Sequence, residues 1–179
     1  MRRPFRRGVR KELPASLPVS ALVGLAVLNL DQLVKEYVSA AIPLGESRSF
    51  LPGLVELRTL HNYGAAWSSF AGMRWLLTIA TSVIVLWILT LLLRGRVRHP
   101  VGVLACCLVI SGGLGNIFDR IRLGYVVDMF CFQFMDFPIF NVADMCIDAG
   151  VILGVIYYYR WFDKDKEGEA GHGTDHPPA

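Results

Sequence analysis

The chain has 179 residues, of which 54% are hydrophobic, and its formal net charge is +3. This composition, with a mean hydropathy of +0.45, is too apolar for an ordinary soluble domain. It also lacks the cysteine framework of a small secreted domain and the many alternating strands of a porin. The sequence therefore predicts an α-helical integral membrane protein.

Four apolar stretches are long enough to cross about 30 Å of hydrocarbon as helices. They occupy approximately residues 17–38, 75–93, 101–118 and 143–160. No internal repeat or linker separates them, so we expect one membrane domain over residues 17–162.

Lys and Arg residues flank these spans unevenly, and basic residues near spans are retained in the cytoplasm. One side would carry Arg2, Arg3, Arg6, Arg7, Arg10, Lys11, Arg94, Arg96, Arg98, Arg160, Lys164 and Lys166. The other side would carry only Arg48, Arg58, Arg74, Arg120 and Arg122. We therefore expect a basic cytoplasmic tail at 1–16, a flexible polar cytoplasmic tail at 163–179, and outer segments at 39–74 and 119–142.

The first span follows a basic start, and its apolar run up to Leu30 loosely resembles a cleavable signal peptide. Asp31, Lys35 and Glu36 separate that run from the small residues that a cleavage site would need, which favours an uncleaved span. Asp31 and Lys35 are four residues apart, so they share a helix face and are expected to pair. A role beside the active site is the alternative for these two residues.

The first outer segment is predicted to form structure of its own. Residues 54–60 partly alternate apolar and polar side chains, which predicts a strand in a small extracytoplasmic sheet between helices one and two. Asn62 follows, and Gly64 lets another backbone approach closely. A simple turn into the second span is the alternative. Three aromatic residues fit an interfacial belt: Trp67, Phe70 and Trp75.

The third span ends in a glycine-rich run at Ser111–Asn116, and such small residues allow close helix packing in membranes. Asn116, Asp119 and Arg120 are expected to form a hydrogen-bonded polar cluster at the outer boundary. This cluster would support the loop that carries Asp128.

Asp128 and Asp144 stand at the edges of apolar segments, where a carboxylate is costly, by roughly 2.5–3.5 kcal/mol at a helix centre. Asn141 is a good helix N-cap and Asp144 suits the positive end of a helix, but capping does not explain Asp128. Two poorly solvated carboxylates share one proton, so one can act as general base and the other as general acid. Asp148, one helical turn deeper, is a competing partner.

The remaining candidate ligands indicate neither a metal nor a cofactor. The cysteines, Cys106, Cys107, Cys131 and Cys146, have no metal-binding spacing and are interpreted as small apolar residues. His172 and His176 have helical spacing, but glycine and proline around them disfavour a helix.

Five motifs occur together and in order over roughly residues 20–160: Asp31-Gln32-Leu33-Val34-Lys35, Asn62 to Trp67, Gly115-Asn116 to Asp119-Arg120, Val126-Val127-Asp128, and Phe140 to Asp144. Together they resemble the bacterial lipoprotein signal peptidases (signal peptidase II). The resemblance implies that Asp128 and Asp144 are catalytic. Eight further residues would bind substrate or support the site: Asn62, Gly64, Asn116, Asp119, Arg120, Asn141, Asp31 and Lys35.

The resemblance further implies an aspartic endopeptidase of the bacterial cytoplasmic membrane, with its site at the outer face. Its substrate would be a diacylglyceryl-modified prolipoprotein, cut just before the lipidated cysteine; membrane lipid is an expected partner and nucleic acid is not. Met129, Met145 and Asp148 depart from the family pattern. The alternatives are a small proton-coupled transporter or channel and a non-catalytic assembly factor. The oligomeric state is left open.

Overall fold

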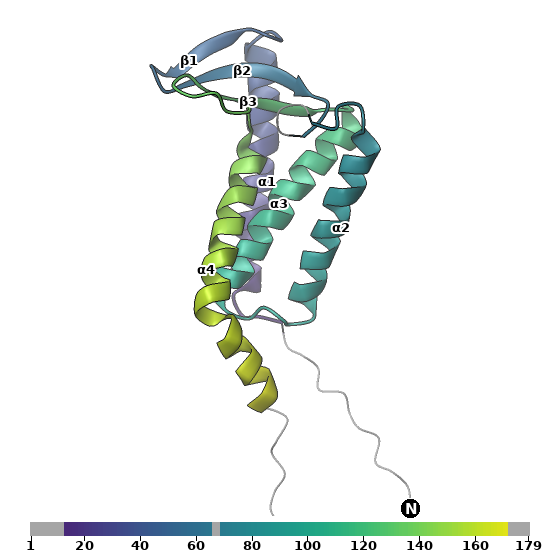
Figure 1. Cartoon of the computed structure of the whole chain (residues 1–179), viewed down its shortest axis with the longest axis vertical. Helices are drawn as coiled ribbons and strands as arrows, with labels where there is room; N and C mark the ends of the chain where they lie inside the picture. Colours follow the sequence, from purple (N-terminus) through teal and green to yellow (C-terminus); the bar gives the residue numbers. More distant parts are fainter. Residues whose placement is uncertain (1–12, 66–68, 172–179) are drawn as a thin grey trace, which may run out of the picture.

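The computed structural model describes the backbone of residues 13–65 and 69–171, and the side chains of the same residues up to Phe162. The elements, in chain order, are α1 (Leu17–Ala41), β1 (Ser47–Leu51), β2 (Val55–Asn62), α2 (Arg74–Leu93), α3 (Pro100–Arg122), β3 (Val126–Phe132) and α4 (Val142–Gly171). The helices run along the long axis of the molecule, and the sheet lies across one end of the bundle (Figure 1). All four helices contain a stretch that is long and apolar enough to cross a membrane, which confirms the predicted architecture.

Helix α3 is the central helix of the bundle and packs against α1, α2 and α4. Small residues permit this close packing. A Cβ atom added at Gly112 would overlap the carbonyl oxygen of Ala143 on α4, and one added at Gly113 would come within 2.7 Å of Val85 on α2. The glycines of α3 therefore let two neighbouring helices approach its backbone directly.

Two helices run further than the hydropathy pattern predicts. Helix α3 continues to Arg122, so Asp119 and Arg120 lie on its last turns and not in the outer segment expected from residue 119. Helix α4 continues to Gly171, so the backbone is helical over the first part of the expected polar tail. His172 and His176 lie outside the described residues.

The sheet is antiparallel with the strand order β1-β2-β3. The strand expected at 54–60 is present as β2, which confirms the small sheet that was expected between the first two helices. Its third strand, β3, was not predicted and comes from the segment between α3 and α4. The first four residues of β3, from Val126 to Met129, are all buried. A strand covered on both faces shows no alternation of apolar and polar residues, and for that reason the pattern did not predict it.

The sheet is fixed to the end of α1 by packing and by a hydrogen bond. Val38 of α1 and Ile42, which follows this helix, form a buried cluster with Val127 and Met129 of β3. The hydroxyl of Thr59, on β2, donates to the carbonyl of Ile42 at 2.8 Å. The strands therefore have a defined position on the bundle.

Among the expected aromatic belt, Phe70 and Trp75 are 59% and 61% exposed near the start of α2, at the sheet end of the bundle (Figure 1). Trp67 lies outside the described residues. The two described side chains are therefore placed where interfacial aromatic residues are expected.

Replacing Gly112 by alanine should destabilise the bundle, because the new methyl group would overlap Ala143 and lie 2.7 Å from Ile147. Overpacking of this kind costs about 1–3 kcal/mol. The matched control is Gly154→Ala on α4, where an added Cβ has no neighbour within 4 Å. Thermal unfolding of both variants in detergent should show a lower midpoint for Gly112→Ala only, and equal midpoints would contradict the close packing of α3 on α4.

Candidate active site

Asp128 lies in the middle of β3, opposite Leu60 of β2, and only 2% of its surface is exposed. Both of its carboxylate oxygens accept hydrogen bonds from side-chain amides. Asn62 donates to Oδ2 at 2.8 Å, and Asn141 donates to Oδ1 at 2.6 Å. The side chain is thus held by one residue from the adjacent strand and one from the start of α4.

Asp144 lies in the first turn of α4, where it forms a reciprocal cap with Asn141. The backbone N–H of Asp144 donates to Asn141 Oδ1 at 2.9 Å, and the backbone N–H of Asn141 donates to Asp144 Oδ2 at 3.1 Å. The other oxygen, Oδ1, accepts from Asn116 of α3 at 2.8 Å. The capping expected for Asn141 and Asp144 is therefore present. The Asp144 carboxylate accepts hydrogen bonds from both Asn141 and Asn116.

Asn141 connects the two aspartates. Its side-chain amide donates to Asp128 and, at 3.3 Å, to Asn116 Oδ1, while its own carbonyl oxygen caps α4. Asn141 is fully buried. One asparagine thus fixes the position of Asp128 relative to Asp144.

The electrostatic environment of Asp128 favours its protonated form. Burial, and secondarily the negative charge of Asp144, raise the pKa of Asp128 to about 7. The hydrogen bonds from Asn62 and Asn141 and the charge of Lys35 act in the opposite direction and do not cancel this increase. Asp128 can therefore gain or lose a proton near neutral pH.

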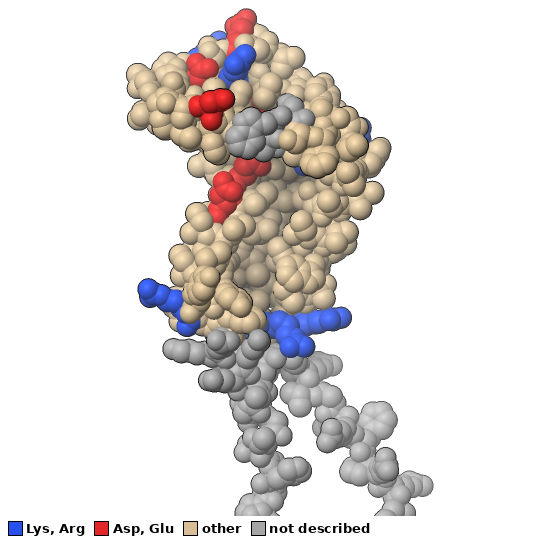
Figure 2. All heavy atoms as spheres, viewed as in Figure 1, with Lys and Arg blue, Asp and Glu red and all other residues tan. Residues whose placement is uncertain are grey.

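Both aspartates line one cavity of about 350 Å³ between the sheet and the helices. Its polar and charged lining comes from Asn62, Thr81, Asn116, Arg120, Asp128, Asp144 and Asp148. Apolar lining is provided by the segment before α4, including Phe137 and Ile139. In Figure 2, acidic atoms reach the surface in the hollow below the sheet, beside α4. The cavity combines two carboxylates with an apolar wall.

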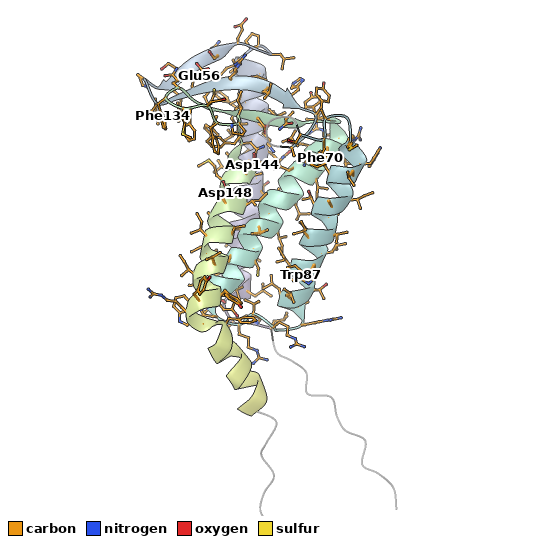
Figure 3. All side chains as sticks on the ribbon, in the orientation of Figure 1. Glu56, Phe70, Trp87, Phe134, Asp144 and Asp148 are labelled. Atoms are coloured by element: carbon orange, nitrogen blue, oxygen red, sulfur yellow. The ribbon has the colours of Figure 1, made fainter. Side chains whose placement is uncertain are left out.

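Asp148 is exposed and lies one turn along α4 from Asp144, further from the sheet (Figure 3). It lines the same cavity, but no hydrogen bond joins its side chain to Asp128 or Asp144 among the described residues. Asp128 and Asp144, by contrast, are connected through Asn141. The geometry therefore favours Asp128, over Asp148, as the partner of Asp144.

Arg120 connects the cavity to the segment after β2. Its guanidinium donates to the carbonyl of Gly64 at 3.2 Å and to the carbonyl of Asn116 at 3.4 Å. The backbone N–H of Gly64 in turn donates to Asn62 Oδ1 at 2.9 Å, which orients the Asn62 amide toward Asp128. Gly64 and Arg120 thus act on Asp128 through Asn62.

Behind the aspartates lies a buried ion cluster centred on Lys35. The expected Asp31–Lys35 pair is present at 2.8 Å, and Asp119 makes a second ion pair with Lys35 at the same distance, which the sequence pattern did not predict. Lys35 also donates to Asn116 Oδ1 at 3.2 Å. Asp31 accepts from the backbone N–H of Ala143 at 2.8 Å and so holds the start of α4.

Asp119 also supports β3, as expected, but none of its hydrogen bonds among the described residues joins it to Asn116 or Arg120, the other members of the expected cluster. Its Oδ2 accepts from the backbone N–H of Val127 at 3.4 Å, and its Oδ1 accepts from Gln32 at 3.1 Å. Among the described residues, no group of three or more His, Cys, Asp or Glu side chains is arranged to hold a metal ion.

The family model of signal peptidase (SPase) II matches residues 23–160 of the chain. This protein belongs to the signal peptidase II family. It is 44% identical to the lipoprotein signal peptidase of Lactiplantibacillus plantarum over 138 residues, covering 76% of this chain and 91% of that protein. It is 38% identical to the lipoprotein signal peptidase of Enterococcus faecalis over 162 residues, covering 89% and 98% respectively. The resemblance inferred from the sequence motifs is confirmed.

The fold is similar to two solved structures of a bacterial membrane enzyme obtained by the in meso method. The structure at 2.3 Å resolution matches with a TM-score of 0.78 and 26% identity, covering 94% of this chain and 99% of that chain. The structure at 1.9 Å resolution matches with a TM-score of 0.76 and 28% identity, covering 84% and 98%. The chain is thus a multi-pass bacterial membrane hydrolase of the signal peptidase II family, which disfavours the transporter and assembly-factor alternatives.

Replacing Lys35 by methionine should strongly destabilise the protein, because Asp31 and Asp119 would remain buried without their cation. Removing one partner of a buried ion pair costs about 3–5 kcal/mol. The control is Arg48→Gln on exposed β1, which also removes one positive charge. Thermal unfolding should show a large decrease for Lys35→Met and little change for Arg48→Gln; similar midpoints would contradict the structural role of the cluster.

Proposed function

We propose that this protein removes signal peptides from prolipoproteins by hydrolysis, with Asp128 and Asp144 as its catalytic residues. Membership of the signal peptidase II family supports the reaction. The single observation that carries the residue assignment is that the two aspartates line one cavity and are linked through the buried Asn141.

Hydrolysis requires one aspartate to be ionised and the other to be protonated. We assign the base to Asp144, whose carboxylate accepts hydrogen bonds from N–H groups of Asn141 and Asn116 at the positive end of α4. We assign the acid to Asp128, because burial and the charge of Asp144 raise its pKa to about 7. The pair would then hold one proton near neutral pH.

In this mechanism Asp144 accepts a proton from water as the water oxygen attacks the scissile carbonyl carbon. Asp128 donates a hydrogen bond and then its proton to the carbonyl oxygen, which stabilises the tetrahedral intermediate. As the intermediate collapses, the C–N bond breaks and the leaving amine takes the proton held by Asp144. One hydroxyl of the intermediate returns its proton to Asp128 as it becomes the carbonyl of the carboxylic acid product, which restores the starting state.

The substrate is proposed to be a diacylglyceryl-modified prolipoprotein that is cut just before the lipidated cysteine. The cavity lies between the sheet and the bundle, so it can receive a peptide whose lipid anchor remains in the membrane. The apolar wall near Phe137 and Ile139 suits a signal peptide or its lipid. The names of the relatives, lipoprotein signal peptidases, support this substrate class.

We further propose that both termini are cytoplasmic and that the sheet and the aspartates face the outer side of the cytoplasmic membrane. Arg94, Arg96, Arg98 and Arg160 lie at the end of the bundle opposite the sheet, where Figure 2 shows basic side chains gathered. Basic residues near spans favour the cytoplasmic side. A lipid-anchored precursor would then present its cleavage site at the outer boundary.

Asp128→Asn and Asp144→Asn should each reduce cleavage of a diacylglyceryl-modified prolipoprotein to the background level, because an amide can neither accept the water proton nor supply one. Asparagine nearly preserves the volume of aspartate, so thermal unfolding should still show a folded protein. The measurement is product formation by the purified protein in detergent, resolved by gel mobility.

Two controls accompany these variants. Asp136→Asn changes an exposed aspartate in the segment before α4 and should retain normal cleavage. Asp148→Asn, inside the cavity but not linked to Asn141, should reduce cleavage by less than about tenfold. Substantial cleavage by either Asp128→Asn or Asp144→Asn would eliminate the assigned dyad, and complete loss in Asp148→Asn would move the acid to that residue.

The pH dependence should follow the proton on Asp128, whose pKa is raised to about 7. The acid form of Asp128 is required, so kcat/KM should fall about tenfold per pH unit above that pKa. Asn62→Leu removes a hydrogen bond that favours the ionised form, so it should move this alkaline limb to higher pH. A limb that is unchanged or moves to lower pH in Asn62→Leu would contradict the assignment of the acid to Asp128.

A further inference from the structure

A second concave surface lies between α1 and α3. Its apolar half has a volume of about 480 Å³ and is lined by Leu25, Leu28, Leu114, Ile117 and Ile121. Its polar half has a volume of about 560 Å³ and is lined by residues that include Glu36, His61, Arg122 and Tyr125. Gln32 and Phe118 line both halves, so they form one surface, which we call the α1–α3 groove.

The α1–α3 groove is separate from the active-site cavity, with which it shares no lining residue. The two surfaces are separate because side chains along β3 and α3 line the cavity and the groove in alternation. On β3, Asp128 lines the active-site cavity and its neighbour Val127 lines the groove. On α3, Asn116 and Arg120 face the active site, whereas Phe118 and Arg122 face the groove. The groove is therefore a candidate site for a different ligand.

The dimensions of the groove match one leaflet of a membrane. Leu25, in the apolar half, and Glu36, in the polar half, are about 16 Å apart along α1 at 1.5 Å of rise per residue. Half of a bilayer's hydrocarbon core is about 15 Å thick. The apolar half thus lies at the depth of acyl chains, and the polar half lies at the depth of headgroups on the side of the sheet.

The charges of the polar half are complementary to a zwitterion. Lys35 and Asp119 also line it, but they are already paired within the buried ion cluster. Glu36 and Arg122 are exposed, and neither makes an ion pair within the described part of the chain. The α1–α3 groove therefore has one carboxylate and one guanidinium without an ion-pair partner among the described residues, next to its apolar half.

Contacts of aromatic rings fix part of the lining of the polar half. His61 and Tyr125 stack with their ring centroids 3.8 Å apart, and the Arg122 guanidinium lies over the Phe118 ring at 5.8 Å from its centroid. The Arg122 side chain makes no hydrogen bond within the described part of the chain, and a guanidinium binds phosphate well through its N–H donors.

We propose that the α1–α3 groove binds one membrane phospholipid with a zwitterionic, amine-bearing headgroup. Arg122 binds the phosphate, Glu36 binds the ammonium group, and one acyl chain lies along Leu25, Leu114 and Ile121. An anionic headgroup without an amine would satisfy Arg122 and leave Glu36 beside the negative charge. The site therefore discriminates between headgroups as well as accepting an acyl chain.

The test is native mass spectrometry of the purified full chain after delipidation and addition of phosphatidylethanolamine or phosphatidylglycerol with identical acyl chains. We expect one phosphatidylethanolamine per protein, bound at least about tenfold more tightly than phosphatidylglycerol, which corresponds to about 1.4 kcal/mol. Arg122→Gln and Glu36→Gln should each weaken phosphatidylethanolamine binding about tenfold. The control Arg48→Gln, on exposed β1, should leave it unchanged.

The two groove variants change the net charge in opposite directions, which separates this site from general attraction between protein and lipid. Non-specific attraction to an anionic lipid would weaken in Arg122→Gln and strengthen in Glu36→Gln. The proposal would be overturned if the two groove variants showed these opposite effects or if the protein bound the two lipids with equal affinity. It would also be overturned if Arg48→Gln weakened phosphatidylethanolamine binding as much as Arg122→Gln does. Displacement of the bound lipid by a prolipoprotein substrate would also overturn it, because the groove would then be part of the substrate site. Thermal unfolding of each variant verifies that it is folded.

Discussion

The burial of Lys35 is the constraint on which the rest of the structure depends. A cation inside a membrane bundle is tolerated only when carboxylates and hydrogen bonds surround it. Asp31 comes from the same helix as Lys35, Asp119 comes from α3, and Asp31 also holds the start of α4 through Ala143. Satisfying one charge therefore sets the relative positions of three helices and of the residues that face the active-site cavity.

The two carboxylates that we propose to be catalytic are carried by regular elements, one on a strand and one on the first turn of a helix. Strands and helices hold side chains more precisely than loops do, and a rigid arrangement needs little rearrangement during the reaction. Asn141 joins these elements because it caps α4 and donates to Asp128. Low exposure of Asp128 makes a proton available near neutral pH, so the same packing that fixes the geometry also adjusts the acidity.

Local signals predicted much of this arrangement. Hydropathy indicated the four spans, the spacing of Asp31 and Lys35 indicated their pair, and the order of motifs indicated the family. The sequence could not indicate that β3 joins the sheet, because both of its faces are covered and its residues do not alternate. Contacts such as those of Asn116 with Lys35 and Asp144 join distant parts of the chain, and only the packing of helices brings them together.

The shift in the pairing of β2 with β3 limits the sequence changes that are compatible with the sheet. The pairing of β2 with β3 shifts between Leu57 and Leu60, and this shift lets Thr59 reach the end of α1 while Leu60 stands opposite Asp128. Neighbouring side chains on a strand point to opposite faces, so a change of one residue in length reverses them. An insertion or deletion here would direct Asn62 toward the α1–α3 groove and away from Asp128. Relatives of this protein should therefore vary in the composition of this strand far more freely than in its length.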